Sequence, residues 1–229
     1  MKVFAIGDLH MSFSQEKPMD IFGESWENYL EEITEDWKKR VSDDDIVLLC
    51  GDLSWAMHLE DAIPDINYVA ALPGIKVILK GNHDYWWQSI AKLREVLPEN
   101  FYAIQNDAIK IGDYIICGSR GWTCPDGTET EEDRKIFNRE VLRLKMSLNS
   151  MEKLRTKDER VILMMHFPPF NVRREDNDIT KLIFEHDIRT VIYGHLHGKE
   201  SSRQRLITKG STKFYLTSCD QVDNKLVEL

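Results

Sequence analysis

The sequence has few cysteines, which argues against a disulfide-stapled or zinc-knuckle protein. Its 229 residues include only four, and none of them belongs to a C-x-x-C pair. Three of them lie in or beside apolar strand-like runs, where a free cysteine is usually a small core residue. Reduced thiols suit a cytoplasmic location, which we therefore expect. The four cysteines are Cys50, Cys117, Cys124 and Cys219.

Long hydrophobic runs are also missing. The apolar stretches, such as residues 161–165, are far too short to span a bilayer. Residues 1–6 enter a strand pattern directly, with no long apolar region before a small-residue cleavage site. We therefore expect neither a secretory leader nor a membrane partner.

Basic residues are fewer than acidic residues. The chain has 30 Lys and Arg against 39 Asp and Glu, which gives a net charge of −9. An acidic surface repels phosphate backbones, which argues against nucleic acid as a partner. It still allows a locally positive, metal-filled pocket that binds one phosphate. A hydrophobic content of 42% with 30% charged residues is typical of a globular chain, and the length suits one domain over residues 1–229.

Short apolar runs that end in Gly, Asp, Asn or His predict buried strands. Continuous β-branched and aliphatic runs of this length are typical of strands covered on both faces. They span residues 3–6, 46–50, 77–79, 161–165 and 191–193. Helical spacing predicts helices at about residues 26–37 with Ser25 as N-cap, 86–97, 130–154 and 179–186.

Alternation of strands and helices implies crossover connections and a largely parallel sheet. Two hairpin signals add antiparallel strands, one at Gly112-Asp113 within residues 109–117 and one at Lys209-Gly210-Ser211 after Ser201. The charged stretch 123–157 is interpreted as a helical insertion on the surface. A solvated amphipathic helix explains its charges better than a partner-binding role.

Polar residues that could bind metal ions or take part in catalysis follow the five expected strands. Carboxyl ends of strands in open α/β sheets converge on one crevice, so these residues can meet in space. Each motif alone has an ordinary explanation, such as a turn or a core histidine. Together they hold five of the seven histidines, which chance explains poorly. The motifs are Asp8-Leu9-His10, Gly51-Asp52, Gly81-Asn82-His83-Asp84, His166 and Gly194-His195-Leu196-His197.

The residue types in these motifs suit two divalent metal ions. Imidazole, carboxylate and amide ligands together favour Mn, Fe or Zn. In an extended His195-Leu196-His197 segment both rings project to the same side, as do the side chains of Asp8 and His10. A carboxylate can bridge two cations and offset their repulsion. Two ions about 3.5–4 Å apart can hold a hydroxide in line with a phosphorus atom.

In order and spacing, the motifs resemble the calcineurin-like metallophosphoesterases from residue 8 to residue 197. The resemblance implies an α/β fold, a four-layer αββα sandwich of mixed β-sheets flanked by helices. It implies that His83 binds no metal, contacts the phosphate and helps protonate or stabilise the leaving oxygen. Asp84 would support the loop. The implied metal ligands are Asp8, His10 and His197 for the first ion, Asn82, His166 and His195 for the second, and Asp52 as the bridge.

The chain departs from many family members after Gly51-Asp52. Trp55 and Ala56 stand where those members have an Asp that orients the catalytic histidine and an Arg that contacts phosphate. Arg120, with glycines nearby on both sides, is a candidate phosphate contact, and an ordinary exposed arginine is the alternative. Trp55 is a candidate to stack on a planar substrate group, with core packing as the alternative.

The expected function is hydrolysis of a phosphate mono- or diester by a hydroxide bridging two metal ions. The expected substrate is a phosphorylated small molecule or another phosphoester. Two alternatives stay open: a non-catalytic protein-docking module on the same scaffold, and a nuclease, which the acidic balance disfavours. The physiological substrate, the native metal and the oligomeric state leave no signature in the sequence.

Overall fold

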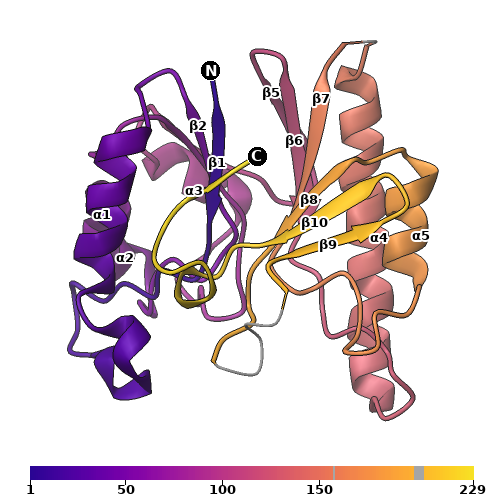
Figure 1. Ribbon diagram of the computed structural model, residues 1–229, viewed down its shortest axis with the longest axis horizontal. Helices are drawn as coiled ribbons and strands as arrows, with labels where there is room; N and C mark the ends of the chain where they lie inside the picture. Colours follow the sequence, from indigo (N-terminus) through magenta and orange to yellow (C-terminus); the bar gives the residue numbers. More distant parts are fainter. Residues whose placement is uncertain (157, 199–203) are drawn as a thin grey trace.

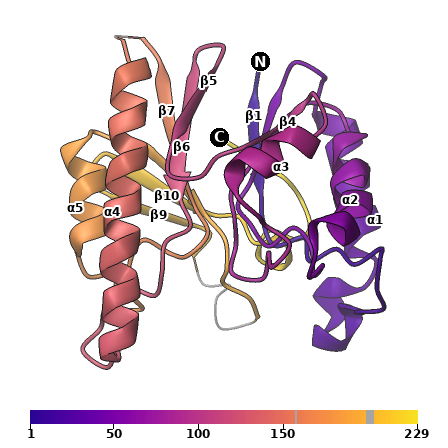
Figure 2. The same cartoon turned by 180° about the vertical axis from the view of Figure 1, so that it is seen from behind.

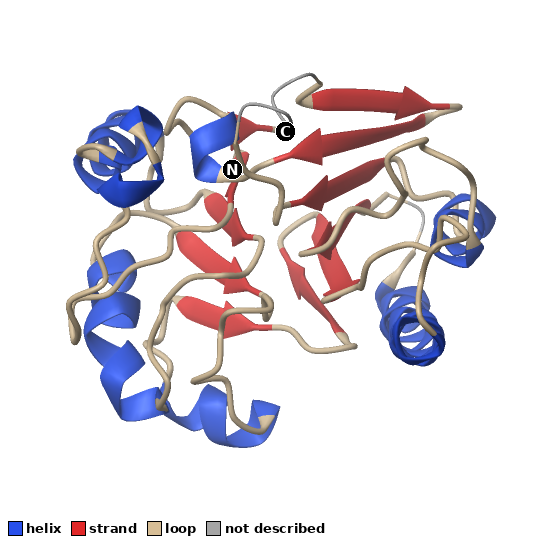
Figure 3. Cartoon of the chain, turned by 90° about the horizontal axis from the view of Figure 1, so that it is seen from below, coloured by secondary structure: helices blue, strands red, loops and turns tan. Residues whose placement is uncertain are grey.

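The computed structural model describes residues 1–156, 158–198 and 204–229. Two β-sheets pack face to face, and helices cover both outer faces (Figures 1 and 3). The layers therefore follow the order helix, sheet, sheet, helix. This arrangement confirms the α/β sandwich that the resemblance implies. No helix within the described ranges is long and apolar enough to cross a membrane.

The first sheet has five strands in the order β11-β1-β2-β3-β4. Its strands are β1 (Val3–Ile6), β2 (Ile46–Leu49), β3 (Ile75–Ile78), β4 (Phe101–Ala103) and β11 (Val227–Glu228). β1 to β4 pair in parallel, and β11 pairs antiparallel to β1. The first three strands confirm the predictions for residues 3–6, 46–50 and 77–79. β4 and β11 are too short to give a pattern in the sequence.

The second sheet has six strands in the order β5-β6-β7-β8-β10-β9. They are β5 (Ala108–Ile111), β6 (Tyr114–Ser119), β7 (Arg160–Met165), β8 (Thr190–Tyr193), β9 (Leu206–Lys209) and β10 (Thr212–Leu216). The β5–β6 and β9–β10 pairs are antiparallel, which confirms both hairpin predictions. Residues 201–203, where the second hairpin region is expected to begin, lie outside the described residues.

The largely parallel pairing is confirmed, and the parallel strands are divided between two sheets, as the sandwich implied by the resemblance requires. Residues 104–107 connect β4 to β5 and carry the chain from the first sheet to the second. Such a short link has no periodic pattern. Alternation of strands and helices therefore cannot reveal where one sheet ends and the next begins.

Helices form the two outer layers (Figures 1 and 2). The first sheet is covered by α1 (Tyr29–Arg40), α2 (Leu59–Ala70) and α3 (Ile90–Val96), and the second by α4 (Glu131–Leu154) and α5 (Asp178–Glu185). Three short 3-10 turns are η1 (Asp20–Phe22), η2 (Glu24–Trp26) and η3 (Cys219–Gln221). The predictions for residues 130–154 and 179–186 are confirmed within a residue or two.

Two predicted helix starts are wrong. Ser25 is not an N-cap, because it lies inside η2, and α1 begins only after Asn28, which has a left-handed backbone at φ 53°. The second helix starts at Ile90 rather than near Trp86, with Ser89 as N-cap. The Trp86 indole donates instead to Asp84, which holds this segment in the loop.

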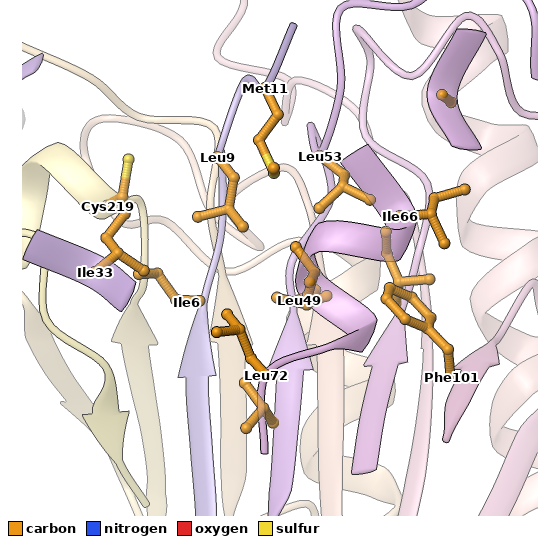
Figure 4. Close-up of a cluster of buried hydrophobic side chains, with 14 of the residues drawn as sticks. Ile6, Leu9, Met11, Ile33, Leu49, Leu53, Ile66, Leu72, Phe101 and Cys219 are labelled. Carbon is orange, nitrogen blue, oxygen red and sulfur yellow. The ribbon is translucent and has the colours of Figure 1, made fainter. Parts of the chain in front are cut away.

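The parallel strands β1, β2 and β7 have both faces in a hydrophobic core, which explains their continuous apolar runs. In β1, Phe4 and Ile6 pack under the helices, whereas Val3 and Ala5 face the second sheet. Figure 4 shows part of the core under α1, α2 and α3, where Ile6 and Leu49 of the sheet meet Ile33 and Ile66 of the helices. The core between the sheets takes residues from both of them.

Most of the charged stretch 123–157, which the sequence suggests as an insertion, is taken up by α4. One face of the helix, including Phe137, Leu144 and Leu148, is buried against the second sheet. The Ser147 hydroxyl donates to Asp107 O and accepts from Gly118 N, both at 2.7 Å. The helix thus belongs to the outer layer of the sandwich. That the stretch 123–157 is an insertion stays a prediction, and its last residue lies outside the described residues.

Candidate metal centre

The five motifs meet at one end of the two sheets, which Figure 3 views from below. Asp8, His10, Asp52 and Asn82 follow β1, β2 and β3 of the first sheet. His166, His195 and His197 follow β7 and β8 of the second sheet. Both sheets therefore contribute to the same cluster.

Four of these side chains stand on a left-handed backbone. The φ angles are 60° at Asp8, 45° at His10, 51° at Asp52 and 71° at His195. Such conformations cost about 1–3 kcal/mol each in ordinary residues and persist only where the surrounding structure holds them. Their gathering at one place is typical of a functional site.

Two motif glycines allow the chain to approach the carboxylates closely. A Cβ atom on Gly81 would overlap the Asp52 side chain, and one on Gly194 would overlap the Asp8 side chain. Only glycine leaves room for this approach. The glycine positions in the motifs are therefore explained by packing around the acids.

One group of ligand atoms comes from Asp8, His10 and His197, which all lie within 4.8 Å of one another. His197 Nε2 is 3.6 Å from Asp8 Oδ1. His10 Nε2 is 3.8 Å from Asp52 Oδ2. These are the residues that the resemblance assigns to the first metal ion, with the bridging carboxylate beside them.

A second group comes from Asp8, Asp52 and His166, again within 4.8 Å. His166 Nε2 lies 3.4 Å from Asp52 Oδ2 and 2.6 Å from Asn82 Oδ1. His195 Nδ1 lies 2.9 Å from the same Asn82 oxygen. The structure thus brings together all the side chains that the sequence suggests as metal ligands, and Asp8 belongs to both groups.

The hydrogen bonds of His166 show why this cluster fits a cation. Its Nδ1 lies 2.8 Å from Cys50 O, which can only accept, so Nδ1 carries the ring proton. Nε2 therefore directs a lone pair toward Asn82 Oδ1 and Asp52 Oδ2, which are lone-pair donors themselves. Facing lone pairs repel each other unless a positive ion lies between them. The donor set suits a divalent transition metal.

Burial keeps most of these imidazoles neutral. It lowers the pKa of His10 to about 3 and that of His195 to about 4, and it also lowers the pKa of His166. Neutral imidazole is the form that binds metal ions. The histidines are therefore ready to act as ligands at neutral pH without losing a proton.

The two buried carboxyls differ in their electrostatic setting. Burial, together with the nearby charges of Asp84 and Asp8, raises the pKa of Asp52 to about 9. Burial opposes ionisation of Asp8 too, but its hydrogen bond with His197 and the neighbouring histidines hold its pKa well below the usual range. A carboxyl in the position of Asp52 takes up either a proton or a metal cation.

Asp220 is a site residue that sequence reasoning missed. Its Oδ1 lies 2.8 Å from His197 Nδ1, and its Oδ2 accepts from Gly198 N at 3.0 Å. Burial alone would lower the pKa of His197, but its hydrogen bonds with Asp220 and Asp8 raise it to about 10. The contact directs Nε2 of the ring toward Asp8. No sequence signal marks Asp220, which lies beyond the last motif.

Asp84 supports the loops, as expected. It is fully buried and accepts hydrogen bonds from Gly81 N at 2.7 Å and from the backbone of Asp52 and Leu53, both at 2.9 Å. The Trp86 indole adds a bond at 3.0 Å. A single carboxylate thus connects the loops after β2 and β3, and through them fixes the position of Asp52.

His83 lies beside the cluster, held by aromatic contacts. Its ring centre is 4.5 Å from that of Trp55, and its backbone N–H donates to Asp52 Oδ1 at 2.7 Å. The buried Nδ1 of His83 has no hydrogen-bond partner among the residues that the structure describes. The tryptophan thus occupies the place next to His83 where many family members have an orienting carboxylate.

Trp55 makes several further contacts. Its ring stacks on His10 with centroids 4.6 Å apart, and Lys17 Nζ lies 3.2 Å from the ring centroid. Its indole N–H donates to Met19 Sδ at 3.2 Å. Trp55 is thus packed on two site imidazoles, and its stacking on a substrate stays a prediction.

The cluster opens into a cleft of about 1110 Å³. His10, His83 and His197 form one part of the wall, and aromatic side chains form another. Arg120 lines a different pocket, together with Lys80, where its guanidinium lies 3.5 Å from Glu140. The structure therefore does not bring Arg120 into the cleft with His83. The aromatic residues of the cleft are Phe22, Trp26 and Trp55.

A helix-covered β-sandwich that gathers carboxylates, imidazoles and an amide at its strand ends defines a protein of the metallophosphoesterase class. The family model described as calcineurin-like phosphoesterase matches residues 1–199, and the chain belongs to this family. The match confirms the resemblance seen in the motifs. No curated protein matches the chain significantly.

Two solved structures are similar to the whole chain. One is TT1561 of Thermus thermophilus, with a TM-score of 0.61, 15% identity, and coverage of 99% of this chain and 97% of that one. The other is AQ665 from Aquifex aeolicus, a protein of unknown function, with a TM-score of 0.52, 16% identity, and coverage of 99% and 95%. At such identities the similarity concerns the fold.

Proposed function

We propose that the protein hydrolyses a phosphate mono- or diester, with two divalent cations as cofactors. The observation that carries the proposal is the position of Asp52 Oδ2, which lies 3.8 Å from His10 Nε2 and 3.4 Å from His166 Nε2. This oxygen stands between two groups of ligand atoms, where a carboxylate shared by two cations would offset their mutual repulsion. When bound, the two cations would supply an activated water and neutralise charge on the phosphate. Mn, Fe and Zn are the metals that suit this donor set.

The ligands divide according to the distances described above. One ion would be held by Asp8, His10 and His197. The other would be held by Asn82, His166 and His195, whose donor atoms face one another. Asp52 would connect the two ions. The backbone N–H of His83 and the Asp84 carboxylate keep the Asp52 segment in position.

His83 would act on the phosphoester itself. Burial and the neighbouring His166 lower the pKa of His83, so the imidazole is neutral and carries one N–H. That N–H can donate a hydrogen bond to a phosphate oxygen and so stabilise negative charge on the leaving oxygen. Trp55 fixes the ring by contact rather than by a charge.

The test combines elemental analysis of the purified chain with hydrolysis of nitrophenyl phosphate and bis-nitrophenyl phosphate. We expect Mn²⁺-dependent turnover of at least one ester, and its loss in the presence of a chelator. Asp52→Asn should lower the rate by about 100-fold or more, because the two cations would lose the charged carboxylate that they share. Asp44→Asn, an exposed change of the same kind, should leave the rate unchanged.

Turnover of neither ester, or turnover unaffected by Asp52→Asn, would contradict the proposal. A chain that binds no metal yet captures a protein partner would favour the docking module. Cleavage of single-stranded DNA at moderate salt would favour a nuclease. Comparison of the two nitrophenyl esters separates monoester from diester preference.

We also propose that this activity belongs to the cytoplasm. All four cysteines are free and buried in the structure. Free thiols persist in reducing compartments, whereas oxidising ones favour disulfides. Fractionation of cells that express the chain at native levels would test the location, and recovery in an extracellular fraction would contradict it.

A further inference from the structure

A second pocket, of about 430 Å³, lies between α4 and the loops that follow β3, β4 and β6. It does not share wall residues with the metal cleft. It lies close to the metal centre all the same, because Lys80 directly precedes the Gly81-Asn82 motif and Arg120 O accepts from His166 N at 3.1 Å. Figure 2 shows α4 along β6, which supply part of the wall.

The wall of this pocket carries far more positive than negative charge. Four basic side chains line it, and the only acid among its described lining residues is Glu140. The protein as a whole has a net charge of −9, so the pocket is an exception on an acidic molecule. Like charges gathered at short range repel one another, and a bound anion would offset the repulsion. The basic residues are Lys80, Arg120, Arg139 and Arg143.

Glu140 neutralises only part of this charge. It is fully buried and lies 2.5 Å from Arg143 and 3.5 Å from Arg120. It also accepts a hydrogen bond from Gly121 N at 3.2 Å. Lys80 and Arg139 form no ion pair or side-chain hydrogen bond with any residue in the described ranges. Within the described ranges, two cationic side chains thus remain without an ion-pair partner.

Buried polar atoms at the same place also lack partners. Ser119 is only 2% exposed, and its hydroxyl has no hydrogen-bond partner within the described part of the chain. The same holds for Arg120 Nε. Buried polar atoms normally have partners, so their absence at a pocket wall points to a group that comes from outside the chain.

We propose that this pocket is a second anion site, which binds the phosphate group of a small organic phosphate. Lys80 and Arg139 would supply the uncompensated charge, and Arg120 and Ser119 would donate hydrogen bonds to phosphate oxygens. Trp122 stands at the wall and can contact an organic part of the ligand. The site is separate from the metal ligands and does not require the phosphoesterase reaction.

The first experiment measures binding of inorganic phosphate to the metal-free chain by calorimetry, in the Asp52→Asn background so that catalysis plays no part. We expect saturable binding that Lys80→Gln and Arg139→Gln each weaken by about 10-fold or more, because each removes a charge-assisted contact. Lys145→Gln changes an exposed lysine of the same helix that does not line the pocket, and should alter the affinity by less than about 2-fold.

Absence of saturable phosphate binding, or equal affinity in Arg139→Gln and the parent chain, would overturn the proposal. Arg139 is exposed on α4, so its replacement leaves the fold intact. Failure of this site would say nothing against the metal centre, since the nitrophenyl ester assay does not depend on it.

A second experiment asks whether the phosphate in this pocket belongs to the substrate or to a separate ligand. It uses the metal-loaded enzyme with nitrophenyl phosphate and with a hexose bisphosphate. If the pocket holds a second phosphate of the substrate, Arg139→Gln should raise KM for the bisphosphate alone. If it holds a separate ligand, KM should change for neither ester while phosphate affinity still falls. Both results support the site and differ only in what fills it.

Discussion

At the scale of single residues, the candidate metal centre depends on groups outside its set of candidate ligands. Asp220 contributes no ligand atom, yet its carboxylate lies 2.8 Å from His197 Nδ1 and so sets which ring nitrogen faces Asp8. A carboxylate behind a histidine fixes its tautomer and raises its basicity. Asp220 is therefore a positioning residue for the site.

We expect Asp220→Asn to weaken binding of one metal ion by about 10- to 100-fold, because His197 loses its orienting partner. Titration of the metal-free chain with Mn²⁺ measures the effect, and excess metal should restore much of the activity. Asp223→Asn is the matched control, since this nearby acid pairs with Arg205 and is 68% exposed. Equal metal affinity in the two variants would contradict the role of Asp220.

The sequence predicts the ligands better than it predicts their supports. Asp8, Asp52 and His166 are recognisable because each lies within three residues of the end of a buried strand. Asp220 has no such context, and its contact with His197 exists only in the folded chain. The replacement at Trp55 is visible in the sequence, but its packing on His83 is not.

At the scale of secondary-structure elements, the carboxyl end of α2 is completed by a side chain from the neighbouring strand. Lys76 of β3 is fully buried, and its ammonium donates to Ala70 O at 3.0 Å, to Gly74 O at 2.8 Å and to Leu72 O. The last carbonyls of a helix lack partners within the helix. Lys76 supplies partners there and connects α2 to the first sheet.

Lys76→Met should lower the free energy of unfolding by about 2–4 kcal/mol, because the carbonyls of Leu72 and Gly74, just past α2, lose this donor. Chemical denaturation measures the change. Lys213→Met replaces an exposed strand lysine and should have an effect within about 0.5 kcal/mol. Similar stabilities for the two variants would mean that water replaces the ammonium without cost.

The elements themselves are predictable to different degrees. β1, β2 and β7 are evident because both of their faces are buried, which makes their sequences continuously apolar. α2 gives no clear signal, since Pro64 lies inside it. The start of α1 is obscured by η2, where Trp26 is buried at a helix-like spacing from Tyr29.

At the scale of the whole molecule, the cores leave the thiols inaccessible. Cys50, Cys117 and Cys219 are fully buried, and Cys124 is 4% exposed. Burial raises the pKa of Cys117 and of Cys124 to about 12. Because only the thiolate reacts readily, these side chains should be inert while the chain is folded.

We expect a thiol reagent such as dithionitrobenzoate to label none of the cysteines in the native protein and all four in guanidinium. The rate of labelling in water should then report the rate of global opening. Labelling of one cysteine at the rate of a free thiol would show that part of a core opens locally.

The fold class follows from the motifs, whereas the arrangement of the strands does not. Strand and helix alternation is a local property, and it cannot tell one sheet from two. The division depends on the short connection between β4 and β5 and on side chains such as Ala5 and Met164 that meet only across the sandwich. These contacts join residues far apart in the chain.

The contribution of both sheets to one cluster has a consequence for how the protein matures. Asp8, Asp52 and Asn82 are synthesised in the first half of the chain, and His166 and His195 in the second. A nascent chain with only β1 to β4 in place carries Asp8, His10, Asp52 and Asn82 but none of the three later histidines. We therefore expect metal binding and phosphoester hydrolysis to arise late, after the two halves of the chain have docked. Incomplete chains should neither retain metal tightly nor attack phosphoesters in the cell.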